Sequence, residues 1–374
     1  MHYRQNRTEE ILATSRDGHV HIEQWNDIVC GSDYLATYKS GQIKPGDVVF
    51  HMSIDGVQLY RDKESDCWIG IYVIHDLPLD VRYTHNFVFP AVVIGGPNKP
   101  KNLESFMFPS LEHVSALQNE GLRIFDSFTQ SIIPRSIPFL LFGTADSVAM
   151  ATMAGLVGHS GKFGCRLYCL LPGRHRPNDG HYYPALLKPD NYDVEGCDHP
   201  DVDPKDIRRV YSQGLEERYL RNLQKVAASR NQTQYTKNRR ETGIVKPTIY
   251  SGCKATLSIP KMLPLDGMHL NDLNNPDLKL GLWRGVVKSY PPDSPENWPW
   301  AVLKGDLWTA HGLSVEMARP YLPSSFGTAP RNPAEKINTQ YKAWEFQLYM
   351  YGYGPALFYH VIPYAYWVNF CRMV

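Results

Sequence analysis

The sequence has few cysteines, no secretion signal and no long apolar run. Seven of its 374 residues are Cys, and the polar start Met1–Arg7 has no apolar signal region after it. An odd number of thiols without a signal region argues against a disulfide framework and indicates reduced thiols. A membrane-spanning helix needs about twenty consecutive apolar residues. Because no such run is present, a membrane is not expected among the partners.

An excess of one charge is also absent. The formal net charge is +1, with 21% charged and 43% hydrophobic residues. These values describe an ordinary globular protein. Any contact with nucleic acid must therefore depend on local basic patches rather than on overall charge. The length is sufficient for two domains, or for one domain with a large insertion.

Three runs of β-branched and aromatic residues follow a polar lead-in of residues 1–45. They are Val48–Ile54, Trp68–Ile74 and Asn86–Ile94, and each is bounded by Asp, Gly or Pro. Such runs predict strands. Asp55 and Gly56 end the first run, which would leave a carboxylate at the rim of a sheet where glycine lets the chain turn. The alternative is an ordinary strand-to-turn junction, because Asp-Gly is a common hairpin signal.

A helix and a fourth strand come next. Apolar residues at helical spacing lead to a glycine stop at Gly121, and the strand Pro138–Gly143 leads to Asp146. Asp146 would begin a helix over residues 147–154. This order predicts an α/β fold with a ribonuclease H-like core (residues 46–157), a mixed sheet flanked by helices. In that topology the first and fourth strands are neighbours, which would place Asp55 and Asp146 at one edge.

Paired carboxylates at a sheet edge suit Mg²⁺, a hard cation that prefers oxygen ligands. Two such ions can activate an attacking oxygen and stabilise a leaving oxygen in phosphoryl transfer. Neither aspartate alone is specific, since Asp is common at strand ends and helix caps. We therefore interpret Asp55 and Asp146 together as a candidate catalytic pair.

Six short segments occur in a consistent order between residues 53 and 285, inside a stretch of similarity to one known family that runs from about residue 20 to the C-terminus. They are Ser53–Gly56, Gly96–Pro100, Gly143–Asp146, Gly164–Cys169, Asp266–Leu270 and Leu282–Gly285. Together they resemble the transposase of CACTA-type DNA transposons in its fungal form.

The resemblance implies a nuclear cut-and-paste transposase that cleaves phosphodiester bonds at transposon ends and joins them to target DNA. It further implies an Asp-Asp-Glu metal site using Mg²⁺ or Mn²⁺. Self-association is kept as one option, with the oligomeric state left open. Asp55 and Asp146 match the family's two aspartates, and Asp266 and His269 match a downstream Asp-x-x-His signature. Two alternatives stay open: an inactive DNA-binding or interaction module derived from a transposase, and an unrelated metal-dependent nuclease.

The third acid is not assigned from the sequence. Glu316, Glu335 and Glu345 are available, but Glu345 lies in Tyr341–Phe346, which is typical of an ordinary helix face. By resemblance the Glu-bearing segment would come later. We therefore expect a C-terminally incomplete transposase that cleaves transposon ends poorly or not at all.

Cys and His residues gather in an insertion over residues 158–203. They are His159, Cys165, Cys169, His175, His181, Cys197 and His199. Thiolates and imidazoles are zinc ligands, and structural zinc sites take four. Zinc bound by Cys165 and Cys169 is one hypothesis, although Cys-x₃-Cys is looser than the common spacing. The alternative is a pair of buried thiols beside exposed histidines.

A basic helical linker over residues 204–259 follows the insertion. Between Lys205 and Lys246 there are eleven Lys or Arg residues and four acids. A basic segment in a neutral protein predicts contact with a DNA backbone. We select Arg208, Arg209, Lys237, Arg239 and Arg240 for that contact. An ordinary solvated helix face is the alternative.

The C-terminal region, residues 260–374, is predicted to be mostly helical. It includes one helix over Ala334–Met350 and a buried helix pair over Pro355–Val374.

Overall fold

The computed structural model describes residues 2–16, 19–58, 66–96, 100–175, 180–183, 185–188, 201–207, 214–289, 293–339 and 341–374. The chain divides into two compact units, Met1–Leu265 and Asp266–Val374. The boundary predicted from the sequence was residue 260.

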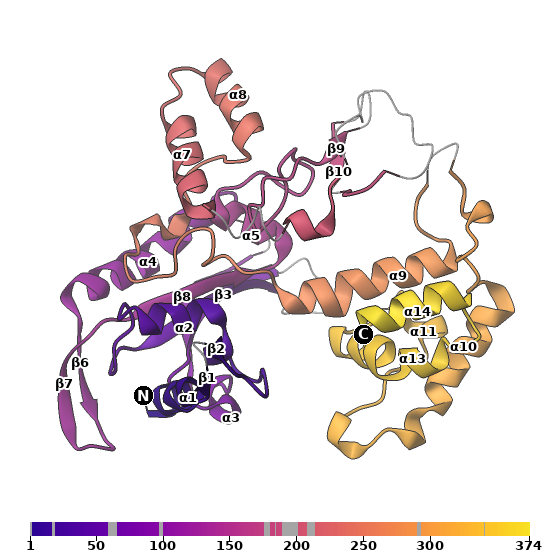
Figure 1. Cartoon of the computed structure of the whole chain (residues 1–374), viewed down its shortest axis with the longest axis horizontal. Coiled ribbons are helices and arrows are strands. Elements are labelled where there is room, and N and C mark those ends of the chain that lie inside the picture. Colours follow the sequence, from indigo (N-terminus) through magenta and orange to yellow (C-terminus); the bar gives the residue numbers. More distant parts are fainter. Residues whose placement is uncertain are drawn as a thin grey trace. The chain divides into compact units, whose positions relative to one another are not determined.

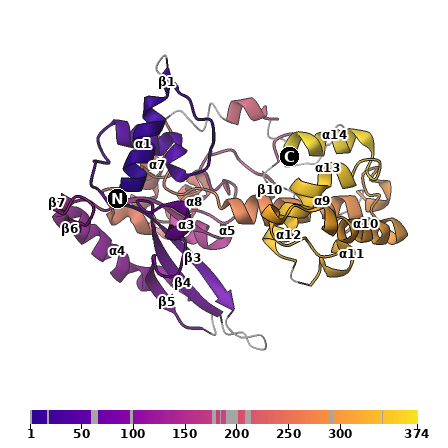
Figure 2. The same cartoon turned by 90° about the horizontal axis from the view of Figure 1, so that it is seen from below.

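The first unit is built on a four-stranded mixed sheet. Its strands are β3 (Val49–Gln58), β4 (Asp66–Ile74), β5 (Val88–Ile94) and β8 (Phe139–Ala145), in the order β5-β4-β3-β8. The β3–β4 and β4–β5 pairs are antiparallel, whereas β3 and β8 are parallel. Figure 2 shows β3, β4 and β5 side by side. The predicted mixed α/β class is therefore confirmed, and each of the four predicted runs contains a strand.

A further segment lies along the outer edge of β8. Leu140 forms an isolated parallel bridge with Thr256. The Leu140 N–H donates to the carbonyl of Ala255, and the Gly143 N–H donates to that of Met262. The chain after residue 250 therefore extends the sheet beyond β8.

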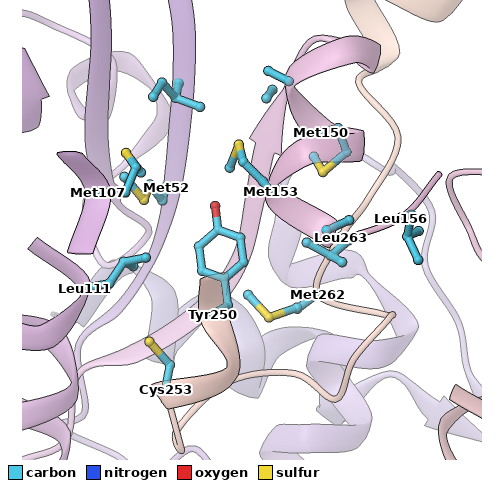
Figure 3. Close-up of a cluster of buried hydrophobic side chains, with 14 of the residues drawn as sticks. Met52, Met107, Leu111, Met150, Met153, Leu156, Tyr250, Cys253, Met262 and Leu263 are labelled. Atoms are coloured by element: carbon cyan, nitrogen blue, oxygen red, sulfur yellow. The ribbon is translucent and has the colours of Figure 1, made fainter. Parts of the chain in front are cut away.

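The core face of the sheet carries Phe50, Met52 and Ile54 from β3 and Leu140 and Ala145 from β8, all buried. Helices α4 (Leu103–Glu120) and α5 (Ser147–Ala154) cover it with apolar side chains. Figure 3 shows Tyr250 among the methionines of this cluster. The segment η2 (Ile249–Gly252) carries Tyr250. Gly121, with φ 83°, ends α4 where the sequence predicted a stop.

The opposite face is here named the aspartate face, because the alternation of side chains along β3 places Val49, His51, Ser53 and Asp55 on it. Where β3 begins, the helices α1 (His2–Ala13) and α2 (Ser32–Lys39) cover this face. Asp55 itself is exposed. The helices α1 and α2 therefore cover one end of the aspartate face, and Asp55 lies at the other end.

The remaining elements of the first unit are short, apart from two helices. They are β1 (Ser15–Arg16), β2 (His19–Val20), η1 (Ile28–Cys30), α3 (Leu79–Arg82), β6 (Leu122–Asp126), β7 (Ser131–Ser136), β9 (Arg174–His175), β10 (Tyr182–Tyr183), α7 (Leu215–Ala227) and α8 (Gln232–Thr242). The sequence analysis did not predict the β6–β7 hairpin, which projects from the body of the unit (Figure 1).

The two ends of the insertion between α5 and η2 are hydrogen-bonded to each other. The Val157 N–H donates to the Gly243 carbonyl, and the Val245 N–H donates to the Gly155 carbonyl. Gly155 has φ 66°, and a Cβ there would overlap the carbonyl oxygen of Lys246. Glycine at residue 155 therefore allows the two ends of the insertion to meet directly behind α5.

The described part of the second unit is helical and packs around Phe358, Tyr349 and Trp283. Its elements are η3 (Met268–Asn274), α9 (Asn275–Arg284), η4 (Pro295–Asn297), α10 (Gly305–Met317), η5 (Arg319–Tyr321), η6 (Ser324–Phe326), α11 (Pro333–Lys336), α12 (Ala343–Gln347), η7 (Leu348–Tyr353), α13 (Gly354–Leu357) and α14 (Tyr364–Met373). Within the described ranges, no helix has the length and apolar character needed to cross a membrane.

The single helix predicted over Ala334–Met350 is wrong. The chain forms α11, then α12 and the π-helical η7. Glu345 lies in the first turn of α12, and its carboxylate accepts from the Lys342 and Arg331 backbone N–H groups. These bonds start a new helix at residue 343.

Candidate functional site

Asp55 and Asp146 directly follow a registered pair of residues on neighbouring parallel strands. Ile54 lies opposite Ala145, and Ser53 lies opposite Thr144. Adjacent strands are about 4.8 Å apart. Ile54 and Ala145 both face the core, and Asp55 and Asp146 are the next residues along the two chains. The structure thus brings together two residues that are 91 positions apart in the sequence.

Asp55 does not end its strand, and this part of the sequence prediction is corrected. Strand β3 continues to Gln58, paired with β4 through Val57 and Cys67. Only the pairing with β8 stops at Ile54. Asp55 is therefore held inside an antiparallel ladder, with its Oδ1 accepting the Gly56 N–H at 2.7 Å.

Asp146 is the N-cap of α5, as the sequence predicted. Its Oδ1 accepts from the backbone N–H groups of Val148 at 3.1 Å and Ala149 at 2.6 Å. This bonding satisfies helix donors that otherwise have no partner. Both bonds use Oδ1, so a ligand of this half-buried side chain would be met by Oδ2. Asp146 thus has a structural role whether or not it binds metal.

Arg166 brings a positive charge from the insertion towards Asp146. Burial of the guanidinium lowers the pKa of Arg166, and attraction to Cys165 and Asp146 opposes that shift. Its Nη1 donates to the Val157 carbonyl at 3.3 Å. Its Nη2 is buried without a hydrogen-bond partner among the residues described. Sequence reasoning did not select Arg166, although the residue lies inside the Gly164–Cys169 motif.

Cys165 and Cys169 face each other across a tight loop. Their thiols are hydrogen-bonded, which lowers the pKa of Cys165 to about 6, assisted by backbone N–H groups of Cys169 and Leu167. Tyr168 takes φ 56° between them, and its buried hydroxyl donates to the Thr242 carbonyl at 2.9 Å. The loop is thereby fixed against α8. The backbone N–H groups of Cys169 and Leu167 point at the Cys165 sulfur, as they would at a metal-bound thiolate.

Among the described residues, neither His175 nor His181 forms a metal-binding group with these thiols. His175 lies in β9, and His181 directly precedes β10. Cys197 and His199 fall outside the residues that the structure describes, as do Pro97, Asn98 and Lys99 of an earlier motif. Among the residues that are described, no group of three or more His, Cys, Asp or Glu side chains is placed to hold a metal. The zinc site stays a prediction.

Asp266 and His269 form a bonded pair in the second unit. His269 Nδ1 lies 2.8 Å from Asp266 Oδ2, and the His269 backbone N–H donates to Oδ1 at 3.1 Å. When Nδ1 donates to the carboxylate, Nε2 is the ring atom left for a metal or a proton. The pair lies at the start of the π-helical η3, a type of segment frequent at functional sites.

The three glutamates considered as a third acid differ sharply in their surroundings. Glu345 is fully buried, and its carboxylate accepts from Arg331 Nε at 2.7 Å and Nη2 at 2.6 Å. Glu316 and Glu335 are exposed. Glu345 is therefore committed to a structural ion pair, and the position of a third acid stays unassigned.

The basic segment forms an antiparallel helix pair, α7 and α8 (Figure 1). Lys237, Arg239 and Arg240 are exposed on α8, while Arg208 and Arg209 lie outside the described residues. Residues 214–246 contain eight Lys or Arg and three acids. The Asn238 amide ties α8 to α7 by donating to the Lys225 carbonyl at 3.0 Å. The helix pair thus presents a fixed cationic surface.

A buried polar chain that the sequence did not predict crosses the covered end of the aspartate face. Arg82 donates to both Asp27 oxygens at 2.8 and 3.0 Å and to His75 Nδ1 at 3.1 Å. Because arginine can only donate, His75 carries its proton on Nε2, which donates to His51 Nδ1 at 2.9 Å. Burial and the Arg82 charge lower the pKa of His51 to about 4. Both imidazoles are neutral at pH 7.

A groove of about 640 Å³ lies on the other side of the sheet. Phe50 and Tyr72 of the core face line it together with Phe106 and Ser110 of α4. The Tyr72 and Ser110 hydroxyls are bonded to each other at 2.7 Å. It is apolar and separated by the sheet from Asp55, so it is not part of the carboxylate site.

Comparison with known proteins adds no identification. No protein-family model matches the chain, and no curated protein matches it closely enough to count as a relative.

Proposed function

We propose that this protein is a DNA transposase with a ribonuclease H-like core, which cleaves phosphodiester bonds at element ends and joins them to a target. The observation that carries the proposal is the placement of Asp55 and Asp146 after the registered pair Ile54 and Ala145. The order β5-β4-β3-β8, with β8 parallel to β3 and a parallel bridge at Thr256 beyond it, supports the fold assignment.

The two side chains fit Mg²⁺ or Mn²⁺. Both offer carboxylate oxygens, which hard cations prefer. Asp55 is exposed, and both cap bonds of Asp146 leave its Oδ2 unused. A metal bound there would supply Lewis-acid activation of the attacking oxygen and stabilisation of the leaving one. The protein's own part is to hold one carboxylate on β3 and the other at the junction of β8 and α5, so that a phosphate is positioned in line.

The decisive experiment compares Asp55→Asn and Asp146→Asn in Mg²⁺- or Mn²⁺-dependent nicking of DNA that contains element ends. Asparagine is as good an N-cap as aspartate, so Asp146→Asn removes the charge and keeps the helix cap. We expect the unmodified chain to nick weakly, because its third acid is unassigned, and each change to abolish the nicking that remains, since positioned metal ligands contribute several kcal/mol to the transition state. Asp80→Asn, at an exposed position in α3, is the matched control.

Nicking that survives both substitutions would contradict the carboxylate assignment. The Glu316→Gln and Glu335→Gln variants belong in the same assay, because a loss in either would locate the third acid. Glu345→Gln is expected to act on stability instead, through its bond to Arg331.

The α7–α8 surface favours a second candidate, an inactive DNA-binding module derived from a transposase. Its exposed cations, Lys237, Arg239 and Arg240, are on α8, whereas Asp55 and Asp146 belong to β3 and to the start of α5. Replacing Lys237, Arg239 and Arg240 by Ala should weaken DNA binding and lower the slope of log affinity against log salt by roughly 0.9 for each phosphate that is no longer neutralised. Lys336→Ala, on the second unit, is the control. DNA binding of this kind without nicking by the unmodified chain would favour the module over the enzyme.

A further inference from the structure

A second hollow, of about 470 Å³, opens on the covered end of the aspartate face. Trp25, Leu79 and Tyr83, which are exposed, line it together with Phe142 and His75, which are less exposed. Trp25 is 70% exposed and Tyr83 is 59% exposed. These residues come from four separate segments of the first unit. We call this site the aromatic hollow.

The floor of the aromatic hollow is rigid. His75 is 1% exposed and is held by bonds from Arg82 and to His51. The Phe142 ring stacks on His51 with centroids 4.7 Å apart and planes at 15°. A ligand here would therefore meet a preformed surface, which reduces the entropy cost of binding.

The charges in the hollow cancel. The Asp27 carboxylate is paired with Arg82 and also accepts the Tyr3 hydroxyl at 2.8 Å. Burial lowers the pKa of His75 well below its ordinary value, so this imidazole is uncharged. A neutral planar ring suits such a site better than a phosphate does. The Asn26 amide, which also lines the hollow, offers its Nδ2 as a donor to the edge of a base, while its Oδ1 already accepts from Arg7 Nη2 at 3.5 Å.

Its position relates the hollow to the carboxylates. Phe142 and Asp146 are four residues apart along β8 and its extension, which corresponds to about 13 Å at roughly 3.3 Å per residue. Thr144 lies between them and faces the same side. A DNA strand with its scissile phosphate at Asp55 and Asp146 would thus have nucleotides within reach of the hollow.

We propose that the aromatic hollow binds one unstacked nucleobase of the DNA strand, held between Trp25 and Tyr83 above Phe142. This inference rests on the proposed function, because it names the part of the DNA that the aspartate face would hold. Stacking on an aromatic ring tolerates any base, since each base has a π face. The strand must therefore be single-stranded or locally unpaired at this nucleotide.

The test measures binding of the full chain to a fluorescent oligodeoxythymidylate in EDTA, where no nicking occurs. We expect Trp25→Ala and Tyr83→Ala each to weaken binding by about tenfold, while Trp25→Phe retains most of it. The control is Tyr321→Ala, whose ring is 86% exposed on the second unit. In addition, the oligonucleotide should quench tryptophan fluorescence in the unmodified chain, and the quenching should be smaller in Trp25→Phe.

Affinities of Trp25→Ala and Tyr83→Ala equal to that of Tyr321→Ala, with unchanged thermal unfolding, would overturn the proposal. Quenching that is identical in Trp25→Phe and the unmodified chain would overturn it as well. The result that would contradict the aromatic hollow differs from the result that would contradict the transposase activity. Nicking that depends on Asp55 but not on Trp25 contradicts the aromatic hollow alone, whereas Trp25-dependent binding without nicking contradicts the transposase activity alone.

Discussion

Gly143 of β8 lies directly beneath the hydroxyl of Tyr250, and a Cβ at residue 143 would overlap that oxygen. Tyr250 is fully buried between the sheet and α4, with Met52, Met107 and Met153 around it (Figure 3). The contact holds η2 against the strand that leads to Asp146. Glycine is required at residue 143 by this close approach.

Gly143→Ala should therefore destabilise the first unit. Overpacking a filled core costs about 1–3 kcal/mol, and urea unfolding would measure it. Gly252→Ala is the control from the same segment, because nothing lies within 4 Å of its Cβ position. An equal loss in the two variants would show that the overlap at Tyr250 is not the cause.

Tyr250→Phe, by contrast, should not lower the free energy of unfolding. The Tyr250 hydroxyl is buried with no hydrogen-bond partner among the described residues, and burial raises the pKa of Tyr250. Because an unsatisfied buried polar group costs about 1–3 kcal/mol, its removal should leave the free energy of unfolding unchanged or raise it. Tyr168→Phe is the contrast, since that hydroxyl bonds to Thr242 and Asn222. It should lose about 1 kcal/mol. A larger loss in Tyr250→Phe than in Tyr168→Phe would refute the argument.

The stability of the first unit should fall as the pH drops from about 6.5 to about 4. Burial, and then the Arg82 charge, lower the pKa of His51 to about 4. The unfolded chain binds a proton at about pH 6.5, whereas the folded chain excludes it until about pH 4. His51 alone thus accounts for about 3 kcal/mol of lost stability across this window.

His51→Gln keeps an acceptor for His75 and should flatten the dependence of unfolding free energy on pH between those limits. His113→Gln, at an exposed position in α4, should leave the curve unchanged. An unaltered slope in His51→Gln would mean that another group controls the acid transition.

Purified protein should contain about one zinc ion per chain if Cys165 and Cys169 are ligands. Cys165→Ser should abolish the zinc and lower the melting temperature, since metal bound only to the folded state stabilises it. Cys371→Ser, a half-buried thiol of the second unit, should change neither value. The absence of zinc together with an unchanged melting temperature in Cys165→Ser would dispose of the site.

The local sequence was sufficient to predict several elements of the structure. The β-branched run before Asp55, the helix stop at Gly121 and the N-cap at Asp146 each depend on a few neighbouring residues, and the structure has all three. The side-chain pattern alone predicted the mixed α/β class for the same reason. The Asp-x-x-His pair also needs only one turn of helix to form.

Long-range contacts decided the rest. Whether β3 stops at Asp55 depends on its partner β4, and the role of Glu345 depends on Arg331, fourteen residues earlier. Arg166 and Asp146 attract each other across twenty positions of sequence, and the buried bond between His51 and His75 joins residues 24 positions apart. The periodicity of the sequence does not indicate which residues far apart in the chain will come into contact. The free energy of burying and pairing them is set only when the chain has folded.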